Sequence, residues 1–180
     1  MKTYGLNNMS VRDVLPVDPS IGRFAGLVLQ LRYVPMREDM RPEQALYHPA
    51  NLITPIVESI PAGAMIVMDA NGENDVDILD GKILMRLKTR GVAAAVTNGG
   101  MRAIPEIDML GIPVCCTTSA PPPSFTKLML ADSECILTCG GVPIFPGDII
   151  VGDDEGTVAI PAEYAAAIAD DGLAQDHIED

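Results

Sequence analysis

The fold is indicated first by residues 78–116, which read ILDGKILMRLKTRGVAAAVTNGGMRAIPEIDMLGIPVCC. The first part predicts an amphipathic helix, because apolar side chains recur on one face and Gly91 can end it. The apolar run over residues 92–97 predicts a buried strand, residues 104–111 predict a short helix, and residues 112–118 predict the next strand. This alternation of strand and helix predicts βαβ units and a parallel sheet.

Segments on both sides extend this sheet. Residues 24–34 and 64–69 predict two further strands, separated by a loop and a helix that ends near Ile60. Residues 142–160 alternate short apolar runs with Pro-Gly and Asp-Glu-Gly turns, which predicts antiparallel hairpins. A final helix is predicted over residues 162–172. The predicted fold class is therefore α/β, with one domain and a mixed, partly parallel sheet.

The ends of the chain are predicted to differ from this domain. Residues 1–20 are rich in turn-forming residues and predict an N-terminal arm, either poorly ordered or folded as a short helix. Residues 21–172 form the predicted domain. Residues 173–180 are expected to be an acidic, frayed C-terminal tail.

Composition limits the classes of partner. The chain has 180 residues, enough for one domain with a substantial core, and a formal net charge of −13. No Lys or Arg follows Lys127 in the sequence. Such a surface repels phosphate backbones and anionic membranes, so neither a nucleic acid nor a membrane is expected as a partner. The acidic surface suits a basic protein partner, although a merely solvated surface is the simpler interpretation.

The cysteines bear on location and on metal binding. The sequence shows no apolar signal segment and no membrane-spanning run, which predicts a cytoplasmic protein with free thiols. Cys135 and Cys139 have a spacing that zinc could use. Cys115 and Cys116 make a poor second pair, because adjacent strand residues point to opposite faces. Buried or half-buried thiols are therefore the favoured interpretation of all four residues.

Two stretches carry candidate chemistry, TNGGMR (residues 97–102) and LDGKIL (residues 79–84). The first places Arg102 beyond a strand end, where α/β sheets bind ligands and where a guanidinium can polarise a carbonyl or hold a carboxylate. Its two glycines are expected to allow a positive φ and a close backbone approach. In the second, Asp80 is a candidate N-cap, and the free amides of the helix start can hold an anion. An ordinary turn and an ordinary cap remain the alternatives; together, the stretches describe a 2-oxo-acid site.

These stretches, with GGVPIFPGDIIVGDDEGTVAIPAE at residues 140–163, resemble the RraA-like family over about residues 10–165. That family includes aldolases of 4-hydroxy-4-methyl-2-oxoglutarate and 4-carboxy-4-hydroxy-2-oxoadipate, oxaloacetate decarboxylases and regulators of ribonuclease E. Its members are often labelled demethylmenaquinone methyltransferases. The resemblance implies an α/β/β/α sandwich, a ring-shaped homotrimer or hexamer, and an active site at the subunit interface.

The resemblance also implies a set of site residues, and this sequence departs from it. In the aldolases a divalent metal and pyruvate meet at an acid that is followed, after twenty residues, by Arg-Asp. Arg102 matches the arginine, but Ala103 stands where the metal-binding Asp is expected and Gly81 where the earlier acid is expected. Asp80 lies next to that position, and Asn98 replaces a common Asp before the glycines. The Mg²⁺ or Mn²⁺ ion expected for the family therefore lacks its usual side chains, and no metal ligand is assigned.

Two functions follow from the resemblance. The first is a carbon–carbon lyase that cleaves or decarboxylates a small 2-oxo-acid, with Arg102 and Asp80 as catalytic residues. Asp80, or an acid from a neighbouring subunit, could replace the lost metal ligand, and Lys82 is a candidate for a metal-free Schiff-base route. The substrate-binding groups expected beside Arg102 are the backbone amides of Gly81, Lys82, Ile83 and Leu84. The second function is that of a non-catalytic member, which regulates a ribonuclease or binds another protein.

Overall fold

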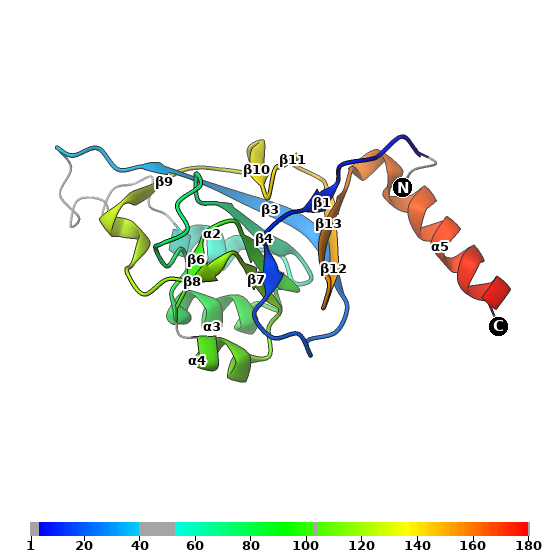
Figure 1. Cartoon of the computed structure of the whole chain (residues 1–180), viewed down its shortest axis with the longest axis horizontal. Helices are drawn as coiled ribbons and strands as arrows, with labels where there is room; N and C mark the ends of the chain where they lie inside the picture. The colour runs from blue at the N-terminus through cyan, green and yellow to red at the C-terminus, as the bar shows by residue number, and fades with distance from the viewer. Residues whose placement is uncertain (1–3, 40–52, 103, 180) are drawn as a thin grey trace.

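A computed structural model describes residues 4–39, 53–102 and 104–179. Its main feature is a nine-stranded mixed sheet in the order β1-β13-β12-β3-β4-β5-β7-β2, with β9 also paired to β3 (Figure 1). Pairing is parallel within β3-β4-β5-β7 and antiparallel elsewhere in this sheet. The strands are β1 (Ser10–Val11), β2 (Leu15–Pro16), β3 (Phe24–Pro35), β4 (Met65–Asp69), β5 (Ala94–Thr97), β7 (Val114–Cys116), β9 (Leu128–Ser133), β12 (Ile149–Asp153) and β13 (Gly156–Ile160).

Three helices cover one face of the parallel strands (Figure 1). They are α2 (Ile53–Ser59), α3 (Gly81–Thr89) and α4 (Ile104–Leu110), and one of them lies in each connection between successive parallel strands. Alternate residues of β4 point toward this face, so Ile66 and Met68 share a buried cluster with Leu84 and Leu87 of α3. The predicted βαβ units are confirmed.

A short hairpin covers the opposite face of the sheet. It consists of β10 (Leu137–Cys139) and β11 (Val142–Ile144), joined through two glycines with positive φ. Met65 and Val67 of β4 share the second buried cluster with the apolar residues of this hairpin. The molecule therefore has a helical layer, a mixed sheet and a hairpin layer, and the predicted mixed α/β class is confirmed (Figure 1).

The N-terminal segment takes part in the sheet. β1 pairs with β13 and β2 pairs with β7, while Val11 and Val14 are buried in the core. The prediction of a poorly ordered arm or a short helix is therefore wrong for residues 10–16. The order of this segment comes from pairing with strands that are distant in the sequence, which local turn signals do not reveal.

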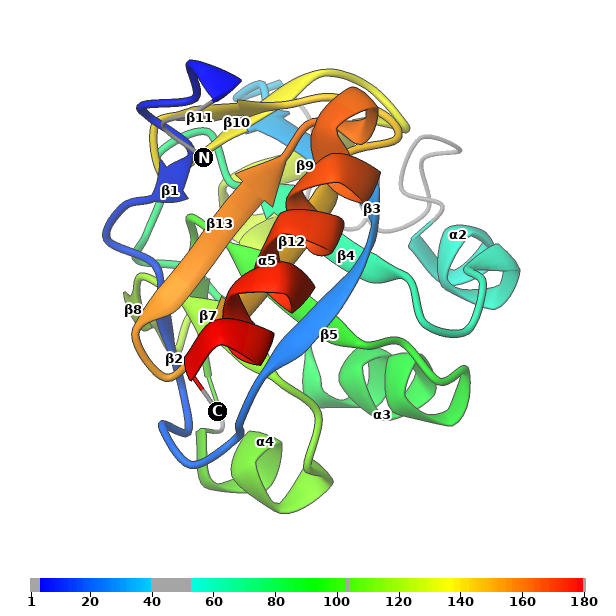
Figure 2. The same ribbon diagram turned by 90° about the vertical axis from the view of Figure 1, so that its right-hand side faces the viewer.

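The C-terminal helix is longer than predicted. After the 3-10 turn η3 (Ala162–Tyr164), α5 (Ala165–Glu179) includes most of the expected acidic tail. It lies in front of β12 and beside β13 in Figure 2, while Figure 1 shows it extending away from the rest of the molecule. The Tyr4 hydroxyl donates a 2.6 Å hydrogen bond to Asp171 and so links this helix to the N-terminal segment. Within the described ranges, no helix is long and apolar enough to cross a membrane.

Candidate functional site

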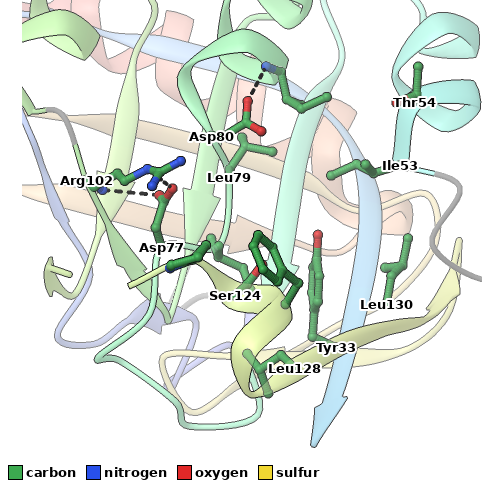
Figure 3. Close-up of a pocket in the computed structure, with 14 residues that line it drawn as sticks. Tyr33, Ile53, Thr54, Asp77, Leu79, Asp80, Arg102, Ser124, Leu128 and Leu130 are labelled. Carbon is green, nitrogen blue, oxygen red and sulfur yellow. Dashed lines mark hydrogen bonds and ion pairs between the residues drawn. The ribbon is translucent and has the colours of Figure 1, made fainter. Parts of the chain in front are cut away.

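A cavity of about 270 Å³ lies where several strand ends and loops meet (Figure 3). Its walls come from the end of β3, the start of α2, the segments after β4 and β5, the 3-10 turn η2 (Ser124–Thr126) and β9. Its polar lining residues are Tyr33, Thr54, Asp77, Asp80, Arg102 and Ser124. The rest of the lining is mostly aliphatic or aromatic. The segments after two neighbouring parallel strands thus converge here, as they do at ligand sites of α/β proteins.

Arg102 is held at this cavity by a buried carboxylate. The Arg102 Nε atom lies 2.8 Å from Asp77 Oδ2, and the Arg102 backbone N–H donates to Asp77 Oδ1 at 3.2 Å (Figure 3). Asp77 is 3% exposed, whereas the Arg102 side chain is 43% exposed. The arginine therefore has a fixed inner partner and an open outer side that a ligand can reach.

Backbone hydrogen bonds fix the position of Asp77, and its burial affects its protonation. Its N–H donates to the Pro122 carbonyl at 2.6 Å, and its own carbonyl accepts from Ser124 at 2.8 Å. These bonds fix the backbone of Asp77 against the loop that leads into η2. Burial raises the pKa of Asp77 to about 6, although the hydrogen bond and positive charge of Arg102 act in the opposite direction. Asp77 therefore changes charge close to neutral pH.

Asp80 is the N-cap of α3, as predicted. Its Oδ1 atom accepts from the backbone amides of Lys82 at 2.8 Å and Ile83 at 3.0 Å, while its carbonyl accepts from Leu84. Its other oxygen has no hydrogen bond to any residue that the structure describes. The amides expected to hold a ligand carboxylate are therefore already engaged by a carboxylate of the chain itself.

Tyr33 is a cavity residue that the sequence does not single out. The residue is 6% exposed and lies where the pairing of β3 with β9 shifts register, between Arg32 and Tyr33. Its hydroxyl points toward the part of the cavity that Leu79 and Ile53 line (Figure 3). Burial, and secondarily the charges of Asp77 and Asp80, raise its pKa above the ordinary range of tyrosine. The phenol therefore keeps its proton at neutral pH.

The two glycines before Arg102 act through packing. Neither Gly99 nor Gly100 has a positive φ, so that expectation is wrong, but the expected close approach is present. A β-carbon on Gly100 would lie 2.3 Å from the Ala120 side chain and 2.6 Å from the Asn74 carbonyl. A side chain there would push apart the loops that carry Asp77 and Arg102.

Asn98 serves the hairpin layer instead of the cavity. Its amide donates to Asp69 Oδ1 at 3.0 Å and to the Thr138 carbonyl at 3.2 Å, and its oxygen accepts from Ala70 N–H at 2.6 Å. A carboxylate at position 98 could not donate to Asp69. The amide therefore fits this sequence better than the acid that the resemblance implies.

The predicted site residues are only partly brought together. Arg102, Asp80 and Ile83 line the cavity, but Gly81, Lys82 and Leu84 do not, and Leu84 is buried in the core. Ala103 lies outside the described residues. All four cysteines are free thiols, three buried and one partly buried, and none lines the cavity. Asp77 and Tyr33 are the residues that the sequence reasoning missed.

The residues of this cavity do not fit the divalent metal that the resemblance implies. Mg²⁺ requires several oxygen ligands in octahedral geometry. Both oxygens of Asp77 are engaged by Arg102, and Asp80 Oδ1 is engaged by the helix amides. In the part of the chain that the structure describes, no group of three or more His, Cys, Asp or Glu residues could hold a metal ion. The methyl group of Ala103 supplies no ligand either.

Similar sequences point to one family. The sequence model of the RraA-like family, described as Aldolase/RraA, matches residues 1–159. A protein of Halalkalibacterium halodurans, provisionally named a 4-hydroxy-4-methyl-2-oxoglutarate aldolase, is 39% identical over 101 residues, 55% of this chain and 47% of its own length. Protein DlpA of Legionella pneumophila is 27% identical over 152 residues, 84% of this chain and 24% of its own length. The chain thus spans about half or less of these two relatives.

Solved structures agree with the sequence comparison. RraAS2 of Streptomyces coelicolor, described as an unusual member of the RNase ES inhibitor RraA protein family, is 26% identical with a TM-score of 0.85. That match covers 99% of this chain and 85% of RraAS2. The RNA-processing inhibitor RraA from Thermus thermophilis shares the fold, with a TM-score of 0.67, 22% identity, and coverage of 89% of this chain and 88% of its own. The family match over most of the sequence and the shared fold show that this chain belongs to the RraA-like family.

Proposed function

We propose that this protein is a carbon–carbon lyase that acts on a small 2-oxo-acid, by retro-aldol cleavage or decarboxylation. The observation that carries the proposal is the Arg102 guanidinium, fixed by buried Asp77 at the wall of a cavity of about 270 Å³. Both reactions send an electron pair into a pyruvate-like enolate. A preorganised guanidinium beside the keto oxygen stabilises that developing charge.

The chain's own residues can divide the work of a retro-aldol step. With a 4-hydroxy-2-oxo-acid, the bond between C3 and C4 breaks and its electrons form the enolate at C2 and C3. Asp80, through the oxygen that does not cap α3, would take the proton of the 4-hydroxyl group. Arg102 would hold the C2 oxygen, and a proton delivered to C3 would complete pyruvate. Asp77 would act as a positioning residue, because its contacts are with Arg102.

The assembly and the location are also part of this proposal. We infer a homotrimer or hexamer with the cavity near the subunit interface, and a cytoplasmic location, from the family that the chain belongs to. A neighbouring subunit would then be able to contribute a further acid. Chromatography with light scattering on the purified protein tests this arrangement, and a monomer at micromolar concentration would contradict it.

The catalytic proposal is tested by following pyruvate release from oxaloacetate and from 4-hydroxy-4-methyl-2-oxoglutarate, with Mg²⁺, with Mn²⁺ and with a chelator. We expect Arg102→Ala to lower turnover by about a hundredfold or more, the usual cost of losing an oxyanion donor. Arg86→Ala is the matched control, because Arg86 pairs with Glu58 on the helical surface away from this cavity. Turnover that is no higher than that of Arg102→Ala under all three conditions would overturn lyase activity on these substrates.

A second candidate function is favoured by one observation. The Asp80 carboxylate takes up the amides that a substrate carboxylate would need, which suits a member that has lost catalysis. RraAS2, 26% identical, is described as belonging to a family of RNase ES inhibitors. A regulator of this kind would present the acidic surface of the chain to a basic protein segment. It predicts no pyruvate release, and salt-sensitive binding to a basic peptide.

A further inference from the structure

The backbone amides at the start of α3 are not free to bind a ligand carboxylate. A carboxylate in the cavity therefore has to be bound by other donors. Lys82 and Ile83 N–H already donate to Asp80 Oδ1, and Leu84 N–H donates to the Asp80 carbonyl. A ligand that displaced Asp80 from the amides would leave the helix without its cap. Arg102 therefore needs another partner among the cavity donors. This step rests on the proposed 2-oxo-acid function.

The Tyr33 hydroxyl is such a donor. Tyr33 is 6% exposed, and no hydrogen bond joins its hydroxyl to any residue that the structure describes. The shift of register between Arg32 and Tyr33 in the β3–β9 pairing lies directly at this residue, and such irregularities redirect side chains. The hydroxyl points into the cavity (Figure 3). The hydroxyl is accessible from the cavity, so a ligand bound there can accept its hydrogen bond.

Charge and shape restrict the ligand further. Two carboxyl groups, Asp77 and Asp80, face the cavity beside one guanidinium, so their summed charge is negative when both acids are ionised. A second carboxylate on the ligand would add repulsion, because the described residues that line the cavity include no second arginine to receive it. Much of the remaining wall is apolar and includes Ile53, Phe125 and Leu128. A ligand side group against this wall gains by being apolar.

We propose that Tyr33 is a substrate-binding residue, and that Tyr33 and Arg102 together select 2-oxo-acids that carry one carboxylate and an apolar side group over dicarboxylates. One of the two donors receives the keto oxygen and the other receives the carboxylate. The apolar side group lies against the wall formed by α2, η2 and β9.

Binding is the first test, and it does not depend on turnover. Calorimetric titration compares 4-methyl-2-oxopentanoate, a monocarboxylate, with 2-oxoglutarate, a dicarboxylate. We expect the monocarboxylate to bind at least about tenfold more tightly, and Tyr33→Phe to weaken its binding about tenfold, as for the loss of one hydrogen bond to a charged group. Tyr164→Phe is the matched control, since Tyr164 does not line the cavity. Because the Tyr33 hydroxyl bonds to no described residue, we expect Tyr33→Phe to fold normally.

A matched pair of substrates is the second test. 4-Hydroxy-4-methyl-2-oxopentanoate differs from 4-hydroxy-4-methyl-2-oxoglutarate by a methyl group in place of one carboxylate. Its retro-aldol cleavage breaks the C3–C4 bond, releases acetone after loss of the 4-hydroxyl proton, and gives pyruvate once C3 is protonated. We expect at least about tenfold higher kcat/KM for the monocarboxylate, with the preference reduced in Tyr33→Phe.

The outcomes separate this inference from the proposed function. Selective, Tyr33-dependent binding without any turnover would support the inference and overturn the lyase. Turnover with equal or better use of the dicarboxylate, or with no effect of Tyr33→Phe, would overturn the inference and leave the lyase standing. Absence of binding by both acids would overturn the inference directly.

Discussion

At the level of single residues, the Asp77 carboxyl combines deep burial with one cationic partner. Its pKa is raised from 3.8 to about 6, mainly by burial. A carboxyl with a raised folded-state pKa contributes its full stability below the unfolded-state pKa, and this contribution is lost as the pH rises through about 6. The charged form that positions Arg102 is therefore kept at a cost in stability.

This cost can be measured with Asp77→Asn, which retains an acceptor for Arg102 but does not titrate. We expect the free energy of unfolding of the variant to rise relative to that of the wild type by about 2 kcal/mol between pH 4 and pH 7.5, because part of the 3.8-to-6 difference in pKa already acts below pH 4. Urea denaturation at several pH values provides the comparison. The other titratable or charged groups that face Asp77 are Arg102, Asp80 and Tyr33. Both proteins contain them, so their own contributions cancel when the two free energies of unfolding are subtracted. A difference that does not change with pH would contradict the raised pKa.

Part of the site could be read from the sequence and part could not. Arg102 follows a strand and a Gly-Gly turn, and Asp80 precedes an amphipathic helix, so both stand in patterns with a local meaning. Asp77 lies in a polar segment that resembles an ordinary solvated loop, and its burial comes from bonds to Pro122 and Ser124, distant in the sequence. Tyr33 lies in a predicted strand, and the strand pattern does not distinguish a cavity residue from an ordinary core residue. Neither residue carries a local signal for its role.

At the level of elements, α3 connects stability with chemistry through its cap. Asp80→Ala removes the acceptor for the Lys82 and Ile83 amides, and we expect it to lower the free energy of unfolding by about 1 kcal/mol. Asp80→Asn keeps a capping oxygen, so we expect a loss below about 0.5 kcal/mol. If Asp80 is the proton acceptor, both variants lose turnover. Full activity in Asp80→Asn would assign Asp80 to capping alone.

Some strands can be predicted from the local sequence, whereas others form only through contacts with distant segments. β4, β5 and β7 are short apolar runs bounded by turns, and the sequence predicts them correctly. β9 and β10 were missed, because residues 128–139 mix polar and apolar residues without clear alternation. β9 exists because it pairs along the far half of β3, and β10 because it packs on the second buried cluster.

At the level of the whole molecule, Asn98 joins the hairpin layer to the sheet. Asn98→Asp keeps the bond from Ala70 N–H, loses the donors to Asp69 and Thr138, and places two carboxylates side by side. We expect a loss of about 2 kcal/mol in the free energy of unfolding at pH 7, and a smaller loss near pH 4, where carboxylates gain protons. Thermal unfolding at both pH values measures the change. Equal losses at both would show that charge repulsion is not involved.

The long strand β3 has a consequence for how the protein is made. A ribosome finishes β3 at Pro35, but its antiparallel neighbour β12 begins at Ile149, and β1 pairs with β13 at the end of the sheet. During synthesis, one edge of an apolar strand therefore stays without its partner while more than a hundred residues are added. Such edges associate with other chains, and pairings between distant segments form slowly. The sheet can thus be completed only after β12 and β13 have been made, and the nascent β3 is the segment that a chaperone would need to shield.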